Sequence, residues 1–192
     1  YMFDYQDNAN PKANEILDKR GIFYDKNRSI DITTSVTGTF TTEGWSVYKY
    51  TNMRSDGQPG SNTTFPDTDF PMFRLADVYL MYAEAVARGG EGGSIATAVQ
   101  YINALRQRAY GDTFHGINEA WLRENNFRNI LDERQRELYW EGTRRTDLIR
   151  YGLFTSGNYL WTFKGGVLGG VGVNGRYNVF PIPTTDLSVN GN

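Results

Sequence analysis

The chain has 192 residues, a formal net charge of −2 and a pI near 5.5, which suits one domain of ordinary size and provides no basic surface for nucleic acid. The absence of cysteine excludes disulfides, thiolate metal sites and a cysteine nucleophile. Because His115 is the single histidine, little remains for a zinc site or a serine–histidine triad, and we expect neither a metal nor a cofactor.

The first 72 residues are predicted to be rich in loops. Residues 14–20 have the composition of a short helix. Residues 29–37 and 45–50 are rich in β-branched and aromatic side chains, which predicts a small β-hairpin that turns around residues 38–44. Residues 52–71 are almost all turn formers, and a loop of this length is uncommon unless it has a function or packs on a partner.

A helical hairpin is predicted next. Apolar residues within 74–88 recur with helical spacing, and Gly89-Gly90 ends the pattern. The predicted inward face consists of Leu75, Val78, Tyr79, Tyr82, Ala83 and Val86. Ser94 is a suitable N-cap for a second helix over residues 95–109, which Gly111 ends. The pair has nearly the length of one tetratricopeptide repeat, although no second copy is detectable.

Two further helices are predicted. The third is capped by Asn125 or Asn126 and covers residues 127–141. The fourth is capped by Thr143 and reaches Tyr151. The sequence therefore predicts a mainly α fold of tetratricopeptide-like helical hairpins with long irregular loops and a minor β-hairpin. Along the chain, this gives a loop-rich segment (1–72), a four-helix block (73–153) and a tail rich in glycine and aromatic residues (154–192).

Charged side chains are concentrated in the second half of the helical block. The block contains 11 arginines, no lysine and 11 acidic residues, so it is neutral as a unit. Glu133, Glu137 and Glu141 could be catalytic carboxylates or metal ligands, but arginine is the cation suited to bidentate pairing at partly buried sites. We therefore predict a structural ion-pair network made of Glu133, Arg136, Glu137, Glu141, Arg144, Arg145, Asp147 and Arg150.

Aromatic residues outside the helices are candidates for ligand binding. An aromatic ring can pack on the apolar face of a sugar, while neighbouring polar side chains bind its hydroxyls. The candidate residues are Tyr24, Trp45, Tyr48, Arg54 and Trp161. The alternative is that these rings cap the ends of the helical block. Residues 170–175 match a G-x-G-x-x-G string, but they lack the flanking strand and helix of a dinucleotide site and predict a loop.

Four motifs occur in an order that resembles one known family. They read FRLADVYLMYAEA at 73–85, YINALRQRA at 101–109, ILDERQREL at 130–138 with RTDLIR at 145–150, and PIP at 181–183. This arrangement is similar to the SusD/RagB family. No motif transfers a ligand-binding residue, so the candidate residues above rest on their chemistry alone.

The resemblance implies a mainly helical, non-catalytic protein of the bacterial cell surface. Such proteins bind glycans, in some cases peptides, and cover a SusC-like TonB-dependent transporter. They are anchored to the outer membrane by a lipidated N-terminal cysteine, which this sequence does not contain. Because members are longer, the chain resembles the C-terminal portion of one, and its partners would include the N-terminal portion, a glycan and the transporter.

Two other functions remain open from the residues themselves. A glycoside hydrolase needs only a pair of carboxylates, and acidic residues are plentiful here. A tetratricopeptide-like adaptor that binds protein segments would need a groove lined by exposed apolar residues.

Overall fold

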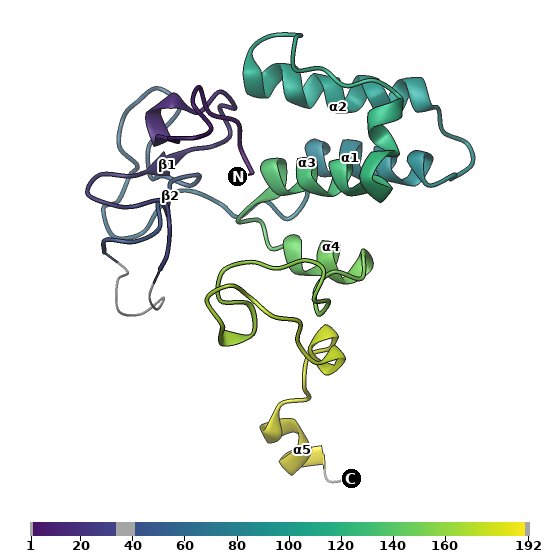
Figure 1. Cartoon of the computed structure of the whole chain (residues 1–192). Coiled ribbons are helices and arrows are strands. Elements are labelled where there is room, and N and C mark those ends of the chain that lie inside the picture. The colour runs from purple at the N-terminus through teal and green to yellow at the C-terminus, as the bar shows by residue number, and fades with distance from the viewer. Residues whose placement is uncertain (1, 34–40, 191–192) are drawn as a thin grey trace. The chain divides into compact units, whose positions relative to one another are not determined.

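The computed structural model describes residues 2–33 and 41–190 (Figure 1). The chain divides into two compact units, unit 1 (Tyr1–Arg144) and unit 2 (Arg145–Asn192). Within the described residues, helices dominate and the regular sheet consists of two short antiparallel strands. The predicted fold class, mainly α with long loops and a minor β element, is confirmed.

Two packed helices form the centre of unit 1. α1 (Leu75–Ala87) is followed by Gly89, whose φ of 94° is a left-handed conformation that glycine adopts without steric cost. α2 (Ile95–Tyr110) begins after Ser94, whose hydroxyl accepts a hydrogen bond from an amide of the first turn at 3.4 Å, and it ends at Gly111 (φ 83°). The predicted helical hairpin is confirmed.

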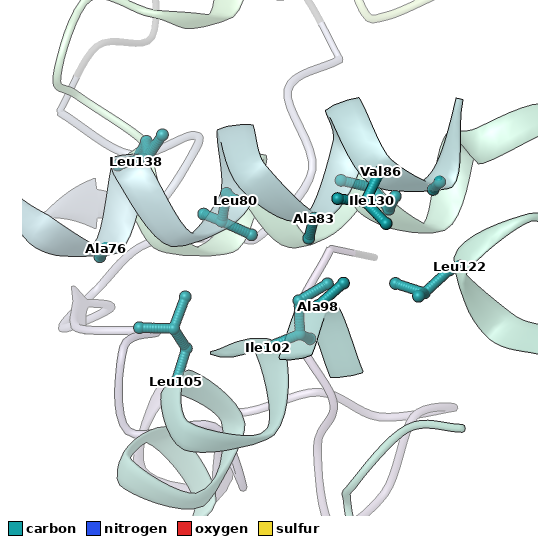
Figure 2. Packing of buried hydrophobic residues seen from close by; sticks show 11 residues of the cluster. Ala76, Leu80, Ala83, Val86, Ala98, Ile102, Leu105, Leu122, Ile130 and Leu138 are labelled. Carbon is teal, nitrogen blue, oxygen red and sulfur yellow. The ribbon is translucent and has the colours of Figure 1, made fainter. Parts of the chain in front are cut away.

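The main hydrophobic core of unit 1 lies between these helices and α3 (Arg128–Leu138) (Figure 2). Ala83 of α1 and Ala98 of α2 are completely buried, and such small side chains let the two helices approach closely. Figure 2 shows Leu105 toward Ala76 and Ala98 toward Ala83, the order expected of antiparallel helices. The other buried members of this core are Leu80, Val86, Ala87, Ile102, Leu122, Ile130 and Leu138.

The inward face of α1 differs in part from the predicted one. Leu75 and Val78 were predicted to face inward but expose 62% and 49% of their surface. The helix instead buries Ala76 and Leu80 beside the correctly predicted Ala83. Because α1 is apolar on most of its sides, periodicity alone does not select a face, and the small side chains decide which side α2 can approach.

The start of α3 also departs from the prediction. A 3-10 segment, Glu124–Phe127, precedes the helix, and Asn125, Asn126 and Phe127 have φ values of 52°, 54° and 64°. Neither asparagine is the N-cap, since the residue before the helix is Phe127 and its side chain makes no capping bond. The side-chain amide nitrogen Nδ2 of Asn125 instead donates to the side-chain oxygen Oδ1 of Asn129 at 2.9 Å. Three successive left-handed residues are a local arrangement that capping preferences do not anticipate.

Two short helices lie toward the C-terminus. α4 (Arg144–Arg150) confirms the fourth predicted helix and is one residue shorter than expected. Residues 180–183, with their two prolines, are non-helical as predicted. α5 (Thr184–Asn190) follows them and was not predicted, because its threonines, serine, valine and asparagine are weak helix formers and its residues are exposed.

None of the helices within the described residues combines the length and the apolar character that a membrane span requires.

The strands pair differently from the predicted hairpin. β1 (Phe23–Tyr24) runs antiparallel to β2 (Ser46–Val47). β2 lies inside the predicted strand 45–50. Of the predicted partner 29–37, residues 29–33 contribute only an isolated bridge from Ser29 to Glu43, and residues 34–40 lie outside the described residues. Phe23 of β1 packs its ring on Phe3, Trp45 and Tyr139, with centroids 5.6, 6.1 and 6.1 Å apart, so aromatic tertiary contacts hold this strand in place.

The predicted helix over residues 14–20 is reduced to one 3-10 turn, Ala13–Glu15. The amide of Lys19 donates to the carbonyl oxygen of Ala109 at 2.9 Å, and the Asp18 carboxylate accepts from the amide two residues later at 3.0 Å. These bonds take the backbone groups that a helix would need, so tertiary contacts override the local preference.

Unit 2 is built from turns around one buried lysine. Lys164 begins the 3-10 turn Lys164–Gly166 and is 2% exposed. Its ammonium donates to the carbonyl oxygens of Leu153, Ser156 and Tyr159 at 3.3, 2.5 and 2.6 Å. One side chain thereby binds three carbonyl oxygens of a single loop, residues 153–159. A second 3-10 turn, Gly175–Asn178, completes the regular structure between α4 and α5.

Candidate functional site

The most heavily charged part of unit 1 is organised around Glu133, which is completely buried in α3. Its carboxylate accepts from Arg20 at 2.8 Å, from Arg106 at 2.7 Å and from Arg136 at 2.8 Å. Arg20 also contacts Asp18 at 2.6 Å. The pairing of Glu133 with Arg136 joins two of the residues predicted to belong to a structural network.

The next carboxylate on the same face of α3 is Glu137, one helical turn later. It accepts from Arg20, Arg74 and Arg108 at 3.0, 2.6 and 2.6 Å. Arg74 extends the network, since it also lies 2.6 Å from Glu141.

Glu141 contacts a lysine as well as Arg74. The ammonium of Lys49 lies 2.5 Å from the Glu141 carboxylate and donates to the carbonyl oxygen of Tyr139 at 2.9 Å. The carboxylates of this network were predicted from the sequence, but most of its cations were not. Those missed are Arg20, Lys49, Arg74, Arg106 and Arg108.

The remaining residues of the predicted network make other contacts. Arg144 lies 4.0 Å from Asp132, and in unit 2 Asp147 pairs with Arg150 at 2.9 Å. Among the described residues Arg145 forms no ion pair, although it was predicted to belong to the network. Its guanidinium instead packs on the rings of Phe154 and Phe180.

The environment of the network keeps its carboxylates ionised. Burial alone would raise the pKa of Glu133, but the charges of Arg136, Arg20 and Arg106 outweigh it and lower the pKa to about 2. Burial also opposes ionisation of Glu137, and hydrogen bonds from Arg108 and Arg74 lower its pKa. Neither group holds a proton near neutral pH, so neither can act as a general acid.

Every buried carboxylate in the described part of the chain is paired with an arginine. They are Asp18, Glu84, Glu133, Glu137 and Asp147. Such pairs stabilise a scaffold only while both partners remain, because an unpaired buried charge is costly. Glu133 and Glu137 thereby join α3 to Arg20 of the N-terminal loop, whereas the Glu84 and Asp147 pairs are local to one helix each.

Asp132 is the exception among the acids of α3, since burial raises its pKa. It lines a polar hollow of about 470 Å³ with Asn125, Asn126 and Arg128. Hydrolysis of a glycosidic bond requires two carboxylates at a defined separation, and the described lining of this hollow contains one.

Two of the candidate ligand-binding residues share the outer face of the strand pair. Tyr24 lies opposite Ser46, and the amide of Tyr48 donates to the carbonyl oxygen of Ile22, which continues the ladder. Side chains alternate along a strand, so Ile22, Tyr24 and Tyr48 lie on one face. They expose 45%, 49% and 52% of their surface, and we name this group the tyrosine face.

Trp45 belongs to the opposite side of the same strands. Its ring packs on Tyr5 and Phe23, with centroids 6.0 and 6.1 Å apart, as part of an aromatic cluster that includes Phe3 and Tyr139. The cluster lines a hollow of about 550 Å³. Trp45 is half-buried, which agrees better with a packing role than with an exposed platform.

A small hollow in the long loop was not assigned to particular residues from the sequence. It has a volume of about 230 Å³ and is lined by the rings of Tyr50 and Phe70 together with Asp69 and neighbouring polar residues. The one feature of the sequence that pointed to this hollow was the unusual length of the turn-rich segment 52–71. Arg54, the fourth candidate of unit 1, lies exposed in this segment, 3.0 Å from Asp56.

Trp161 lies in unit 2, where it lines a cavity of about 700 Å³. It is 39% exposed, and its ring is stacked on Phe154 at 6.2 Å. The predicted candidates therefore divide among the tyrosine face, an aromatic cluster, an exposed loop and a cavity of unit 2.

The described residues contain no group of three or more histidine, cysteine or acidic residues placed to hold a metal ion. His115 stacks on Tyr110 at 4.0 Å and lies 2.9 Å from Asp112 within the same turn.

Comparison with known proteins places these features in a family. The model of the SusD family matches residues 3–192. The starch-binding protein SusD of Bacteroides thetaiotaomicron is 45% identical over 151 residues, covering 79% of this chain and 25% of that protein. SusD-like protein P25 of Formosa agariphila is 44% identical over 86 residues, covering 43% of this chain and 15% of that protein.

The chain thus spans a quarter or less of the length of these curated relatives. The family match nevertheless covers nearly every residue, including the paired helices, the α3 ion-pair network and unit 2. The chain belongs to the SusD family.

Proposed function

We propose that the protein binds a glycan without catalysis at the bacterial cell surface and delivers it to a SusC-like TonB-dependent transporter. The observation that carries this proposal is the 45% identity to a starch-binding protein over 79% of the chain. A lipid anchor at the extracellular face of the outer membrane would hold the full-length protein beside the transporter.

The tyrosine face supports the glycan-binding step. Tyr24 and Tyr48 are exposed on a short, paired backbone, which limits the conformational freedom lost on binding. A phenol ring provides a flat apolar surface for the C–H face of a sugar and a hydroxyl for a hydrogen bond. The hollow formed by Tyr50, Asp69 and Phe70 provides the same combination of rings and polar groups in the adjoining loop segment.

The pairing of the buried carboxylates supports binding over hydrolysis. Glu133 and Glu137 each accept from three arginines, and their pKa values are lowered. A glycosidase would need one carboxylic acid with a raised pKa beside a second free carboxylate.

Titration calorimetry with neutral glycans tests the proposal. The unaltered chain is titrated with maltooligosaccharides and with a panel of other neutral oligosaccharides, and each mixture is then analysed for hydrolysis products. We expect heat of binding without cleavage. Tyr24→Ala and Tyr48→Ala should each weaken binding roughly two- to ten-fold, the equivalent of about 0.5–1.5 kcal/mol per aromatic contact.

Phe114→Ala is the matched control, because Phe114 is an aromatic residue of unit 1 that is 93% exposed and lies outside the tyrosine face. Cleavage of any oligosaccharide would contradict a non-catalytic role. Absence of binding to every glycan, neutral or acidic, would overturn the proposed function. For the delivery step, the full-length protein should co-purify with a TonB-dependent transporter from outer membranes.

A further inference from the structure

The cavity of unit 2 has a lining unlike those of unit 1. Four aromatic rings contribute to it, those of Phe154, Trp161, Tyr177 and Phe180. Tyr177 and Phe180 expose 51% and 79% of their surface, so the rings are accessible. A volume of about 700 Å³ lies within the range of sites for small molecules, which are largely apolar with a few placed polar groups.

Three cations line the same cavity, and each lies close to one or more of its aromatic rings. The Arg145 guanidinium carbon lies 4.0 Å from the centroid of Phe180 and 5.1 Å from that of Phe154. The guanidinium also donates to the carbonyl oxygen of Tyr177 at 2.7 Å. An arginine stacked on rings keeps its in-plane donors available for a planar anion.

The other two cations differ in availability. Arg176 is exposed and lies 5.2 Å from the ring centroid of Tyr177. The Lys164 ammonium is directed to three carbonyl oxygens and lies 4.6 Å from the ring of Trp161. Lys164 therefore contributes charge to the cavity, while Arg145 and Arg176 retain donors for a ligand.

No carboxylate neutralises this charge at the cavity. Its described lining contains no acidic residue. Unit 2 has two acids, of which Asp147 is buried and paired with Arg150, while Asp186 lies in α5 outside the lining. Arg145 and Arg176 form no ion pair within the described residues, which contrasts with the arginines around Glu133 and Glu137.

A close-packed glycine segment forms one wall. A Cβ on Gly170 would lie 2.5 Å from the carbonyl oxygen of Trp161, and one on Gly172 would lie 2.9 Å from the amide nitrogen of Gly157. The amide of Val173 fastens the segment to the carbonyl oxygen of Thr155 at 2.9 Å. Packing thus explains the first two glycines of the G-x-G-x-x-G string, and Gly172 belongs to the lining of the cavity.

We infer that this cavity binds an acidic sugar residue, whose carboxylate or sulfate ester contacts Arg145 and Arg176 while its ring packs on Trp161 and Phe180. The inference rests on the proposed glycan-binding function and adds the charge class of the ligand. Aromatic rings alone would suit a neutral sugar, whereas two unpaired guanidiniums without a neighbouring carboxylate favour an anionic group.

Matched oligosaccharides test this assignment by calorimetry. The unaltered chain is titrated with trigalacturonate, with a sulfated trisaccharide and with neutral maltotriose, each at low and at physiological salt. We expect at least one acidic sugar to bind more tightly than maltotriose, with an affinity that falls as salt rises. Preference for the uronate or for the sulfate ester identifies which acidic group the cavity takes.

Variants assign the binding to the cavity. Arg145→Gln should weaken acidic-sugar binding about ten-fold, as expected for a partly buried charged hydrogen bond, and Arg176→Gln roughly two- to five-fold, as expected for an exposed one. Arg123→Gln is the matched control, since Arg123 is an exposed arginine of unit 1. Circular dichroism confirms that Arg145→Gln, which loses its bond to the Tyr177 carbonyl, still folds.

The possible results separate this inference from the proposed function. Equal binding of acidic and neutral sugars, or acidic binding unaffected by Arg176→Gln and Arg145→Gln, would overturn the inference and leave glycan binding intact. A peptide with a free C-terminal carboxylate that binds in an Arg145-dependent manner, when no acidic sugar does, would make the cavity a peptide site and also overturn it.

Discussion

The guanidinium of Arg20 donates to the carboxylate of Glu133 at 2.8 Å, although the two residues are 113 positions apart in sequence. The Arg20 side chain is 10% exposed and that of Glu133 is completely buried. This ion pair fastens the N-terminal loop of unit 1 to α3. Removal of one partner should lower the free energy of unfolding by more than the intact pair contributes to it, because a buried charge is left without compensation.

Glu133→Gln is therefore expected to lower the free energy of unfolding by about 3–5 kcal/mol, since three guanidiniums would face a neutral amide. Urea unfolding followed by circular dichroism measures the change. Glu91→Gln, in the exposed turn between α1 and α2, should remain within about 0.5 kcal/mol of the parent. Similar small changes in both variants would show that the buried pairs are not needed.

Acid should destabilise the fold through the same carboxylate. The pKa of Glu133 is about 2 in the folded chain against an ordinary value of 4.5. Below pH 4.5 the unfolded chain binds the proton first, so the contribution of Glu133, about 3 kcal/mol, is present above pH 4.5 and is lost as the pH falls toward 2. Urea midpoints between pH 7 and pH 2 measure the loss, and Glu133→Gln should show a shallower decline. Parallel pH profiles for the two proteins would contradict the assignment.

Lys164→Met should loosen unit 2, because the carbonyl oxygens of Leu153, Ser156 and Tyr159 would lose their shared donor. We expect the free energy of unfolding to fall by about 2–4 kcal/mol, as for buried acceptors left unsatisfied. Amide hydrogen exchange locates the effect, which should appear as faster exchange around residues 153–166. Lys12→Met provides the control, since that side chain is 60% exposed. Unchanged exchange in unit 2 would exclude an organising role for Lys164.

Two neighbouring glycines provide a matched test of the backbone packing beside the cavity. Gly170 has a φ of 76° and its Cβ would meet the Trp161 carbonyl oxygen at 2.5 Å, whereas a Cβ on Gly169 would meet nothing within 4 Å. Gly170→Ala should lower the free energy of unfolding by about 1–3 kcal/mol, and Gly169→Ala should change it by less than about 0.5 kcal/mol. Thermal unfolding of both variants decides, and equal melting temperatures would contradict the close packing.

The paired helices could be predicted because their signals are local. Ser94 and Gly111 mark the ends of α2 through the capping requirements of the helix itself. The strand pairing could not be predicted, since β1 is selected by the apolar surface it buries against distant residues. Tyr24 and Tyr48 were identified as candidates from residue type, but only the register of β1 and β2 places them on one exposed face.

The sequence by itself determined the family, the helical hairpin and the presence of an arginine–carboxylate network. Motif order, helical periodicity and charge balance depend only on the order of residues along the chain. Only the tertiary structure decided which cations complete that network. Arg20 and Lys49 come from loops that lie far from Glu133 and Glu141 in sequence. It also showed that Arg145 packs on Phe180 and donates to the Tyr177 carbonyl oxygen within unit 2, since such contacts depend on distances of a few ångströms that residue order does not specify.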